Sequence, residues 1–239
     1  MSSVVSRRSL LRAGGASVAF AAVSACSSGS SKSVPSATTT PVRNPDDALR
    51  RLLDGNKRFV DNKLTAVGRD DVRRAEQAEH QTPFAIVVGC SDSRVLPEVI
   101  FDEGIGDLFL VRVAGNTAAA PVLIGSVEYA ATTFSCHLVL VLGHESCGAV
   151  KAAIDVGKKG KTLPGSLPSV VEPILPSVQR VKDLEGDELV NAVTRGNILA
   201  TVNQLRTSDS LLRDLIAAGT LKVVGAEYHL HSGEIEVLD

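Results

Sequence analysis

From about residue 84 onward, short apolar runs alternate with longer segments in which apolar residues recur at helical spacing. The runs hold consecutive Val, Ile and Leu residues, which is typical of strands buried on both faces in a parallel sheet. The segments between them are long enough to be crossover helices. We predict strands at residues 84–88, 107–111, 138–142 and 221–226, an edge strand at 234–238, and helices at 97–101, 118–133, 147–156, 167–181, 187–207 and 210–218.

The folded part begins with a predicted helical arm. Asn44 or Asp46 can cap a helix, and apolar residues follow at helical spacing as far as Phe59. A second helical stretch at 70–80 is mostly charged, so we expect it to be exposed or to pack on a partner subunit. The predicted fold class is α/β: a central, mainly parallel β-sheet flanked by helices, with an N-terminal helical arm, in one domain spanning 46–239.

Residues 1–26 have the features of an export signal. Arg7 and Arg8 precede apolar residues, as in a twin-arginine signal. The apolar stretch at 13–25 is shorter than the roughly 20 residues that a spanning helix needs. It ends in a Val-Ser-Ala-Cys sequence that resembles the lipobox of bacterial lipoproteins, in which the cysteine, here Cys26, is lipidated and becomes the mature N-terminus. The alternative is a signal that is cleaved elsewhere or not at all, with Cys26 incidental.

Residues 27–45 are rich in Ser, Thr, Pro, Gly and Ala, a composition that cannot form a core. A flexible linker directly after a lipobox cysteine is typical of a domain tethered to a membrane. We therefore expect an exported protein of the cell envelope, held at the membrane through a lipid anchor at Cys26.

Composition and charge exclude some classes of partner. The 239 residues carry a formal net charge of −2, and loss of the three arginines before Cys26 would leave 22 basic against 27 acidic residues, a charge of −5. This mildly acidic balance gives no reason to expect nucleic-acid binding. The four cysteines are too few for a disulfide framework in a chain of this length.

Two short polar runs carry the candidate chemistry. Cys90 directly follows a glycine that ends one predicted strand, and His144 follows a glycine that ends another, with Cys147 three residues later. Parallel strands end at the same edge of a sheet, so we expect these three side chains to converge. Two thiolates and an imidazole are ligands that zinc takes in tetrahedral sites. The alternative is that both cysteines are small buried residues and that the histidine is structural.

Three protein ligands are typical of a catalytic zinc, which keeps its fourth position for water. Asp92 and Arg94 follow Cys90 at alternate positions, so the carboxylate could reach the metal region while the guanidinium holds it in a forked pair. Asp92 could then orient a zinc-bound hydroxide, or become a fourth ligand that closes the site. The alternative is a structural salt bridge.

Cys-x-Asp-x-Arg after one strand and Gly-His-x-x-Cys-Gly after another resemble the β-class carbonic anhydrases. The similarity extends from about residue 46 to the C-terminus and includes the run from Arg112 to Asn116. It implies one zinc ion per subunit on Cys90, His144 and Cys147, with an Asp92–Arg94 dyad. It also implies a homodimer or higher oligomer, with active sites near the subunit interface and N-terminal helices lying over the partner.

The resemblance also carries over substrate-pocket residues. Gln81 matches the glutamine that binds a substrate oxygen in plant-type members, Phe109 and Tyr129 match pocket aromatics, and Gly148 matches a glycine whose backbone N–H contacts the ligand. The alternative for the aromatics is core packing, and for Gln81 an exposed turn.

A second bicarbonate site of one branch of the family is put in doubt by this chain. Val95 and Arg112 match two of its positions. That branch also has a tryptophan three residues before its first ligand, where this chain has Val87, and there is no tryptophan anywhere in the sequence.

The resulting hypothesis is zinc-dependent, reversible hydration of carbon dioxide to bicarbonate and a proton, with a zinc-bound hydroxide attacking CO2 and Asp92 orienting it. Two alternatives stay open. One is a zinc hydrolase of carbonyl sulfide or carbon disulfide on the same scaffold, and the other is a zinc-binding lipoprotein without catalytic activity.

Overall fold

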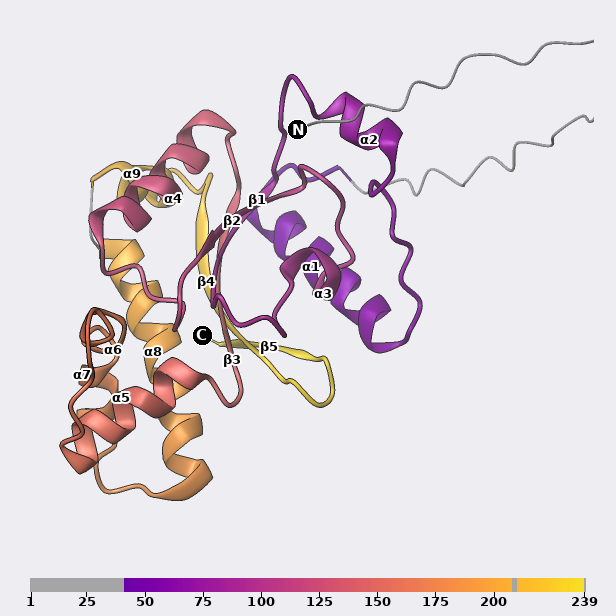
Figure 1. Cartoon of the computed structure of the whole chain (residues 1–239). Helices are drawn as coiled ribbons and strands as arrows, with labels where there is room; N and C mark the ends of the chain where they lie inside the picture. Colours follow the sequence, from indigo (N-terminus) through magenta and orange to yellow (C-terminus); the bar gives the residue numbers. More distant parts are fainter. Residues whose placement is uncertain (1–40, 208–209, 239) are drawn as a thin grey trace, which may run out of the picture. The chain divides into compact units, whose positions relative to one another are not determined.

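A computed structural model describes residues 41–207 and 210–238 (Figure 1). The predicted signal at 1–26, including Cys26, and the predicted linker as far as residue 40 lie outside the described residues. Within the described part of the chain, every helix is too short or too polar to cross a membrane.

The described residues form a sheet of five strands in the order β2-β1-β3-β4-β5. The first four are parallel to their neighbours, and β5 pairs antiparallel with β4, as expected of the edge strand. The mainly parallel α/β class is therefore confirmed. The strands are β1 (Ala85–Gly89), β2 (Leu108–Arg112), β3 (Leu138–His144), β4 (Lys222–Tyr228) and β5 (Ile235–Leu238).

Successive residues of the central strands point to opposite faces of the sheet, and both faces are covered. In β1, Ile86 and Val88 belong to one hydrophobic core, whereas Ala85 and Val87 belong to the other. This burial on both faces explains why the strand is a continuous apolar run. It was also predicted for β2, but β2 lies at the sheet edge and most of its residues are only half-buried.

The helices pack on the sheet in two layers (Figure 1). One layer covers the face that contains Ile86, and the other, formed by the N-terminal arm and the short helix after β1, covers the opposite face. A third apolar cluster joins the helix after β3 to α8 and to two short helices. The first layer is α4 (Pro121–Thr133), α8 (Gly186–Thr207) and α9 (Ser210–Ala217); the second is α1 (Pro45–Val60) and α3 (Pro97–Ile100); the third cluster adds α5 (Gly148–Lys159), α6 (Pro168–Val171) and α7 (Leu175–Arg180).

The N-terminal arm begins as expected. The Asn44 side chain accepts a hydrogen bond from the Asp47 N–H at 2.8 Å, which caps α1, and Leu52 is fully buried against the sheet. The second helix, α2 (Asp71–Glu76), is shorter than the predicted 70–80, and none of its six described residues is buried. Without an apolar face to pack, α2 is held by its capped first turn and by Arg73, which donates to the Ile105 carbonyl at 2.9 Å and to the Asp107 carboxylate at 3.0 Å.

Two other predicted helices differ in extent. The segment predicted as one helix at 167–181 forms α6 and α7 instead, because Pro173 lacks the N–H that a continuous helix would need there. The helix predicted from residue 118 begins at Pro121, which occupies the first helical turn.

The topology brings the two polar runs together. The sheet order reverses between β1 and β3, which lie side by side with Gly89 opposite Leu142. Loops at the carboxyl ends of such strands diverge and leave a crevice where ligands bind in open α/β sheets. Cys90 follows β1, and His144 is the last residue of β3, so both emerge at this crevice.

Candidate metal centre

Three buried donor side chains converge at the carboxyl ends of β1 and β3. The Cys90 and Cys147 sulfurs and a nitrogen of His144 all lie within 4.8 Å of one another. The two sulfurs are 4.0 Å apart. Two Zn–S bonds of about 2.3 Å at a tetrahedral angle place their sulfurs about 3.8 Å apart. The donor set therefore fits one tetrahedral zinc ion.

The ring of His144 is oriented for metal binding. Its Nδ1 lies 2.8 Å from the backbone carbonyl oxygen of Glu145, so Nδ1–H donates and Nε2 is left with a free lone pair. His144 is fully buried, and its Nε2 has no hydrogen-bond partner among the described residues. A buried polar atom without a partner is costly, and a ligand at this position would satisfy it.

The two thiols have different electrostatic surroundings. A hydrogen bond from Cys147 lowers the pKa of the Cys90 thiol to about 4, against the opposing effect of burial. The pKa of Cys147 is raised because its proton is shared with the Cys90 thiolate. Cys147 is the N-cap of α5, whose backbone N–H groups face the sulfur and favour its ionised form. A divalent cation replacing the shared proton would give two thiolate ligands.

An ion pair lies beside the donor set. Arg94 donates from Nε to one oxygen of Asp92 at 2.9 Å and from Nη2 to the other at 2.7 Å, and its backbone N–H adds a third bond at 3.0 Å. The Arg94 side chain holds the pKa of Asp92 well below its usual range. The Asp92 carboxylate is 3.8 Å from Nε2 of His144. An ionised carboxylate therefore faces the donors.

A second layer of contacts holds the Cys90 sulfur. The Gly115 N–H lies 3.4 Å from Sγ of Cys90, and the buried Asn197 of α8 donates to the Gly115 carbonyl at 2.8 Å. Gly115 has φ +81°, where a side chain is strained, and a Cβ there would lie 2.9 Å from Ile174. The sequence analysis assigned neither residue a role at the site. Gly115 lies in the run from Arg112 to Asn116 that resembles the family, which is a signal that could have identified it. Asn197 lies in a helix whose sequence pattern does not distinguish it from other polar residues.

Arg112 holds the loop that follows β1. Its Nε donates to the Cys90 carbonyl at 2.9 Å, and its Nη2 donates to the carbonyls of Asp92 and Val95 at 2.9 and 2.8 Å. Val95 and Val87 are both fully buried in the core on the α1 side of the sheet. Val95 and Arg112 are the two positions associated with a second bicarbonate site. In this structure they contact each other through the backbone carbonyl of Val95.

The other expected pocket residues lie elsewhere in the chain. Gln81 and Tyr129 line a cavity of about 730 Å³ together with Phe134, next to the segment that leads into β2. Phe109 packs beside this cavity, with its ring centroid 6.3 Å from that of Tyr129. Gln81 precedes β1 and Cys90 follows it, and a five-residue strand spans about 17 Å. The length of β1 therefore separates Gln81, and the cavity that it lines with Tyr129, from the donor set within one chain.

Gly148 is close to the donors. It directly follows Cys147 as the first residue of α5, and it is exposed. A Cβ at this position would meet no heavy atom within 4 Å. Its backbone therefore borders open space next to the donor cluster.

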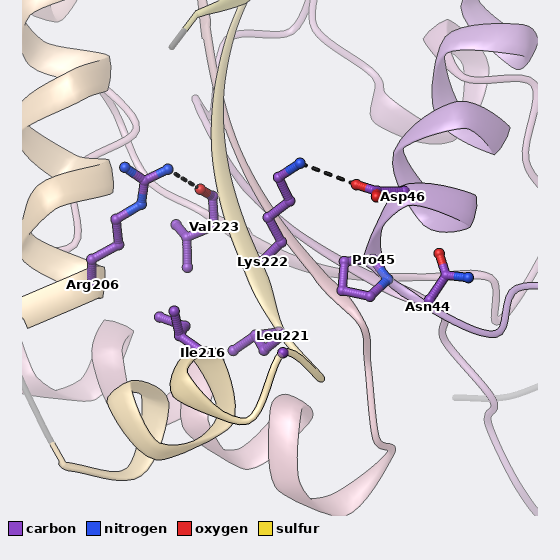
Figure 2. A pocket seen from close by; sticks show the side chains of 9 residues that line it. Asn44, Pro45, Asp46, Arg206, Ile216, Leu221, Lys222 and Val223 are labelled. Atoms are coloured by element: carbon purple, nitrogen blue, oxygen red, sulfur yellow. Dashed lines mark hydrogen bonds and ion pairs between the residues drawn. The ribbon is translucent and has the colours of Figure 1, made fainter.

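A second cavity lies at the amino end of β4, away from the donors (Figure 2). It measures about 500 Å³ and is lined by residues of α1, α8, α9 and β4. Lys222 forms an ion pair with Asp46 at 3.1 Å across it, and Arg206 donates to the Val223 carbonyl at 2.6 Å. Its charged side chains are thus engaged in structural contacts.

Comparison with known proteins agrees with this geometry. A sequence model of the carbonic anhydrase family matches residues 85–235. A carbonic anhydrase of Mycolicibacterium smegmatis is 40% identical over 197 residues, covering 82% of this chain and 95% of that protein. The solved structure of the β-carbonic anhydrase CcaA is 27% identical, with a TM-score of 0.64, over 80% of this chain and 87% of that one.

A more distant structure shows the same fold. One of two tetrameric β-carbonic anhydrases from the ascomycete Sordaria macrospora is 21% identical, with a TM-score of 0.65, over 80% of this chain and 97% of that one. The family match covers more than half of the chain, and it includes all three donors at the crevice between β1 and β3. The chain accordingly belongs to the carbonic anhydrase family of zinc enzymes, in its β class.

Proposed function

We propose that this chain catalyses the reversible hydration of carbon dioxide at a zinc ion held by Cys90, His144 and Cys147. The observation that carries the proposal is the donor set itself, with two sulfurs and an unpartnered buried imidazole nitrogen within 4.8 Å of one another. These three side chains have the number and chemistry of donors typical of a catalytic zinc.

Zinc bound there would supply Lewis-acid chemistry, which lowers the pKa of water to about 7 and makes hydroxide available at neutral pH. Asp92 would accept a hydrogen bond from the attacking hydroxide and so direct its lone pair toward the carbon of CO2. Arg94 would keep Asp92 ionised and fix its orientation through the forked pair.

Gly148 would contribute a backbone N–H at the start of α5. The free N–H groups of a helix N-terminus favour negative charge, which develops on the oxygens of CO2 as bicarbonate forms. The open space beside Gly148 leaves room for a ligand oxygen.

Asp92 would also have a second role. Its carboxylate lies 3.8 Å from Nε2 of His144, so it would be near enough to the donors to bind the metal itself in place of water. Arg94 would oppose this, because it holds both carboxylate oxygens. We propose that the strength of this pair sets the balance between an open and a closed site.

The remaining pocket residues would come from another subunit. Gln81 is exposed and the Tyr129 side chain is 54% exposed, although both line a cavity. We propose a homodimer or higher oligomer in which Gln81, Phe109 and Tyr129 of one subunit complete the substrate pocket of its partner. The exposed α2 would then lie over the partner.

We propose, from the sequence alone, that the protein is exported and anchored to the membrane at Cys26. Replacing Cys26 with alanine should move the protein from the membrane fraction to the soluble fraction. Unchanged fractionation would contradict the anchor without affecting the catalytic proposal.

The catalytic proposal is tested by stopped-flow CO2 hydration at about pH 8.5 with the zinc-loaded protein. Cys147→Ser should lose both zinc and rate, whereas Asp92→Asn should keep zinc and lose rate. Wild-type protein that binds one zinc per chain but gives only the uncatalysed background rate of hydration between pH 7 and 9 would contradict the proposal. It would favour a non-catalytic zinc protein, or a hydrolase to be tested with carbonyl sulfide.

A further inference from the structure

The turn between two of the metal donors is strained. Only two residues separate His144 from Cys147, and Ser146 in this turn has φ +54°, a left-handed conformation that is unfavourable for a residue with a side chain. Such a conformation persists only where surrounding contacts impose it. The contacts that impose it therefore also position both donors.

Glu145 attaches this turn to the end of β4. Its backbone N–H donates to the Tyr228 carbonyl at 3.1 Å. Its carboxylate accepts a hydrogen bond from Nδ1 of His229 at 2.8 Å and another from the Leu230 N–H at 2.9 Å. The ladder between β3 and β4 ends at the pair His144–Tyr228, so the Glu145 side chain extends the connection beyond the last pair of the sheet.

The same residue orients the His144 ring. The acceptor for Nδ1–H of His144 is the backbone carbonyl of Glu145 itself, at 2.8 Å. The position of this carbonyl depends on how the Glu145 peptide is held. Because the carboxylate is fixed to the segment after Tyr228, any loosening there would let the carbonyl and the imidazole turn together.

His229 is in turn held from the other side. Its Nε2 lies 3.4 Å from a carboxylate oxygen of Glu236 on β5. Arg195 of α8 pairs with both oxygens of Glu236 at 2.7 and 2.8 Å, and with the buried Glu227 at 3.3 Å. A chain of polar contacts thus joins α8 and β5 to Glu145.

We propose that Glu145 and His229 are positioning residues for the zinc site, acting through the Glu145 carbonyl on His144 and through the turn on Cys147. This inference rests on the proposed assignment of zinc to these donors. Outer contacts to a zinc-bound histidine commonly change metal affinity 10- to 100-fold. Here the contact reaches the imidazole through a main-chain carbonyl, whose position is set by the Glu145 side chain.

The test is the rate of zinc release to an excess of a chromogenic chelator, measured on the folded full chain. Glu145→Ala should release zinc about 10-fold faster than wild type. His229→Leu, which lacks the donor to Glu145, should behave similarly. His229→Asn keeps an N–H at the position of Nδ1 and should stay within about twofold of wild type.

A matched control separates positioning from general stability. The buried Asp102 carboxylate accepts hydrogen bonds from the backbone N–H groups of Thr65 and Ala66 and from Arg58, the same kinds of partner that Glu145 has. Asp102→Asn should lower the free energy of unfolding and leave zinc release unchanged. The Glu145→Ala/His229→Leu double variant should release zinc no more than about twofold faster than Glu145→Ala, because both changes remove one interaction.

Cobalt substitution supplies a spectroscopic measurement. The cobalt form of Glu145→Ala should show shifted ligand-field bands, because the imidazole is no longer held in one orientation, whereas Asp102→Asn should match wild type. The inference is overturned if Glu145→Ala releases zinc at the wild-type rate, or if Asp102→Asn accelerates release as much. If wild type itself fails to bind zinc, the proposed function fails instead.

Discussion

Gly115 offers the sharpest test of how the fold supports the donors. Its N–H contacts the Cys90 sulfur at 3.4 Å, and its carbonyl accepts the hydrogen bond from Asn197. Its φ of +81° and its neighbours leave no room for a side chain, since a Cβ would lie 2.9 Å from Ile174 and 3.1 Å from Ala149. We predict that Gly115→Ala disturbs both stability and metal binding.

The expected magnitude follows from two contributions. Left-handed backbone costs an alanine about 1–2 kcal/mol relative to glycine. An extra methyl group in a packed site costs about 1–3 kcal/mol, and the fully buried Ile174 has no solvent to move into. Together they predict a loss of about 2–5 kcal/mol in the free energy of unfolding.

Urea unfolding of the zinc-loaded protein measures this loss, and the chelator assay measures zinc release, which should accelerate. Gly125→Ala is the matched control, because nothing lies within 4 Å of a Cβ at that position in α4. Alanine is favoured over glycine by about 1 kcal/mol inside a helix, so the control should be at least as stable as wild type. A Gly115→Ala protein within about 0.5 kcal/mol of wild type would refute the reasoning.

Three further predictions concern other parts of the fold. Asn197→Ala should cost about 1–3 kcal/mol in urea unfolding, because it leaves the buried Gly115 carbonyl without its donor. Burial raises the pKa of Asp102, but hydrogen bonds, first that from Arg58, lower it to about 2. Stability from this group is therefore present above pH 4 and lost as pH falls through about 2, and the acid unfolding of Asp102→Asn should lack this component. Tyr129→Arg should weaken the proposed oligomer in sedimentation experiments, and an unchanged mass would contradict the placement of that residue at an interface.

Much of the fold was predictable because burial leaves a strong sequence pattern. The central strands β1 and β3 lie between two helical layers and so are continuous apolar runs. The glycines at their ends marked where Cys90 and His144 emerge, and parallel pairing then required the two to meet at one edge. The extent of α2 could not be predicted in this way, because none of its described side chains is buried. Its sequence therefore has no apolar periodicity that would mark where the helix begins and ends.

The outer contacts of the site were beyond sequence reasoning for a different reason. Asn197 is 82 positions from Gly115, and His229 is 84 positions from Glu145. Each pair forms only when elements distant in sequence pack together. The apolar periodicity of these elements reflects which residues face the hydrophobic core, and it does not indicate which polar residues will form such pairs. Nothing in the local pattern separates such a residue from an ordinary helical asparagine or a histidine after a strand.

The most direct test of the central claim is a zinc titration of the CO2 hydration rate. Metal-free protein is reconstituted with increasing zinc, and the initial rate is measured by stopped flow at each point. We predict no rate above the uncatalysed background without zinc, a linear rise to one zinc per chain, and no rise for Cys147→Ser. Catalysis above background in the metal-free protein, or full zinc occupancy with only the background rate, would contradict the claim.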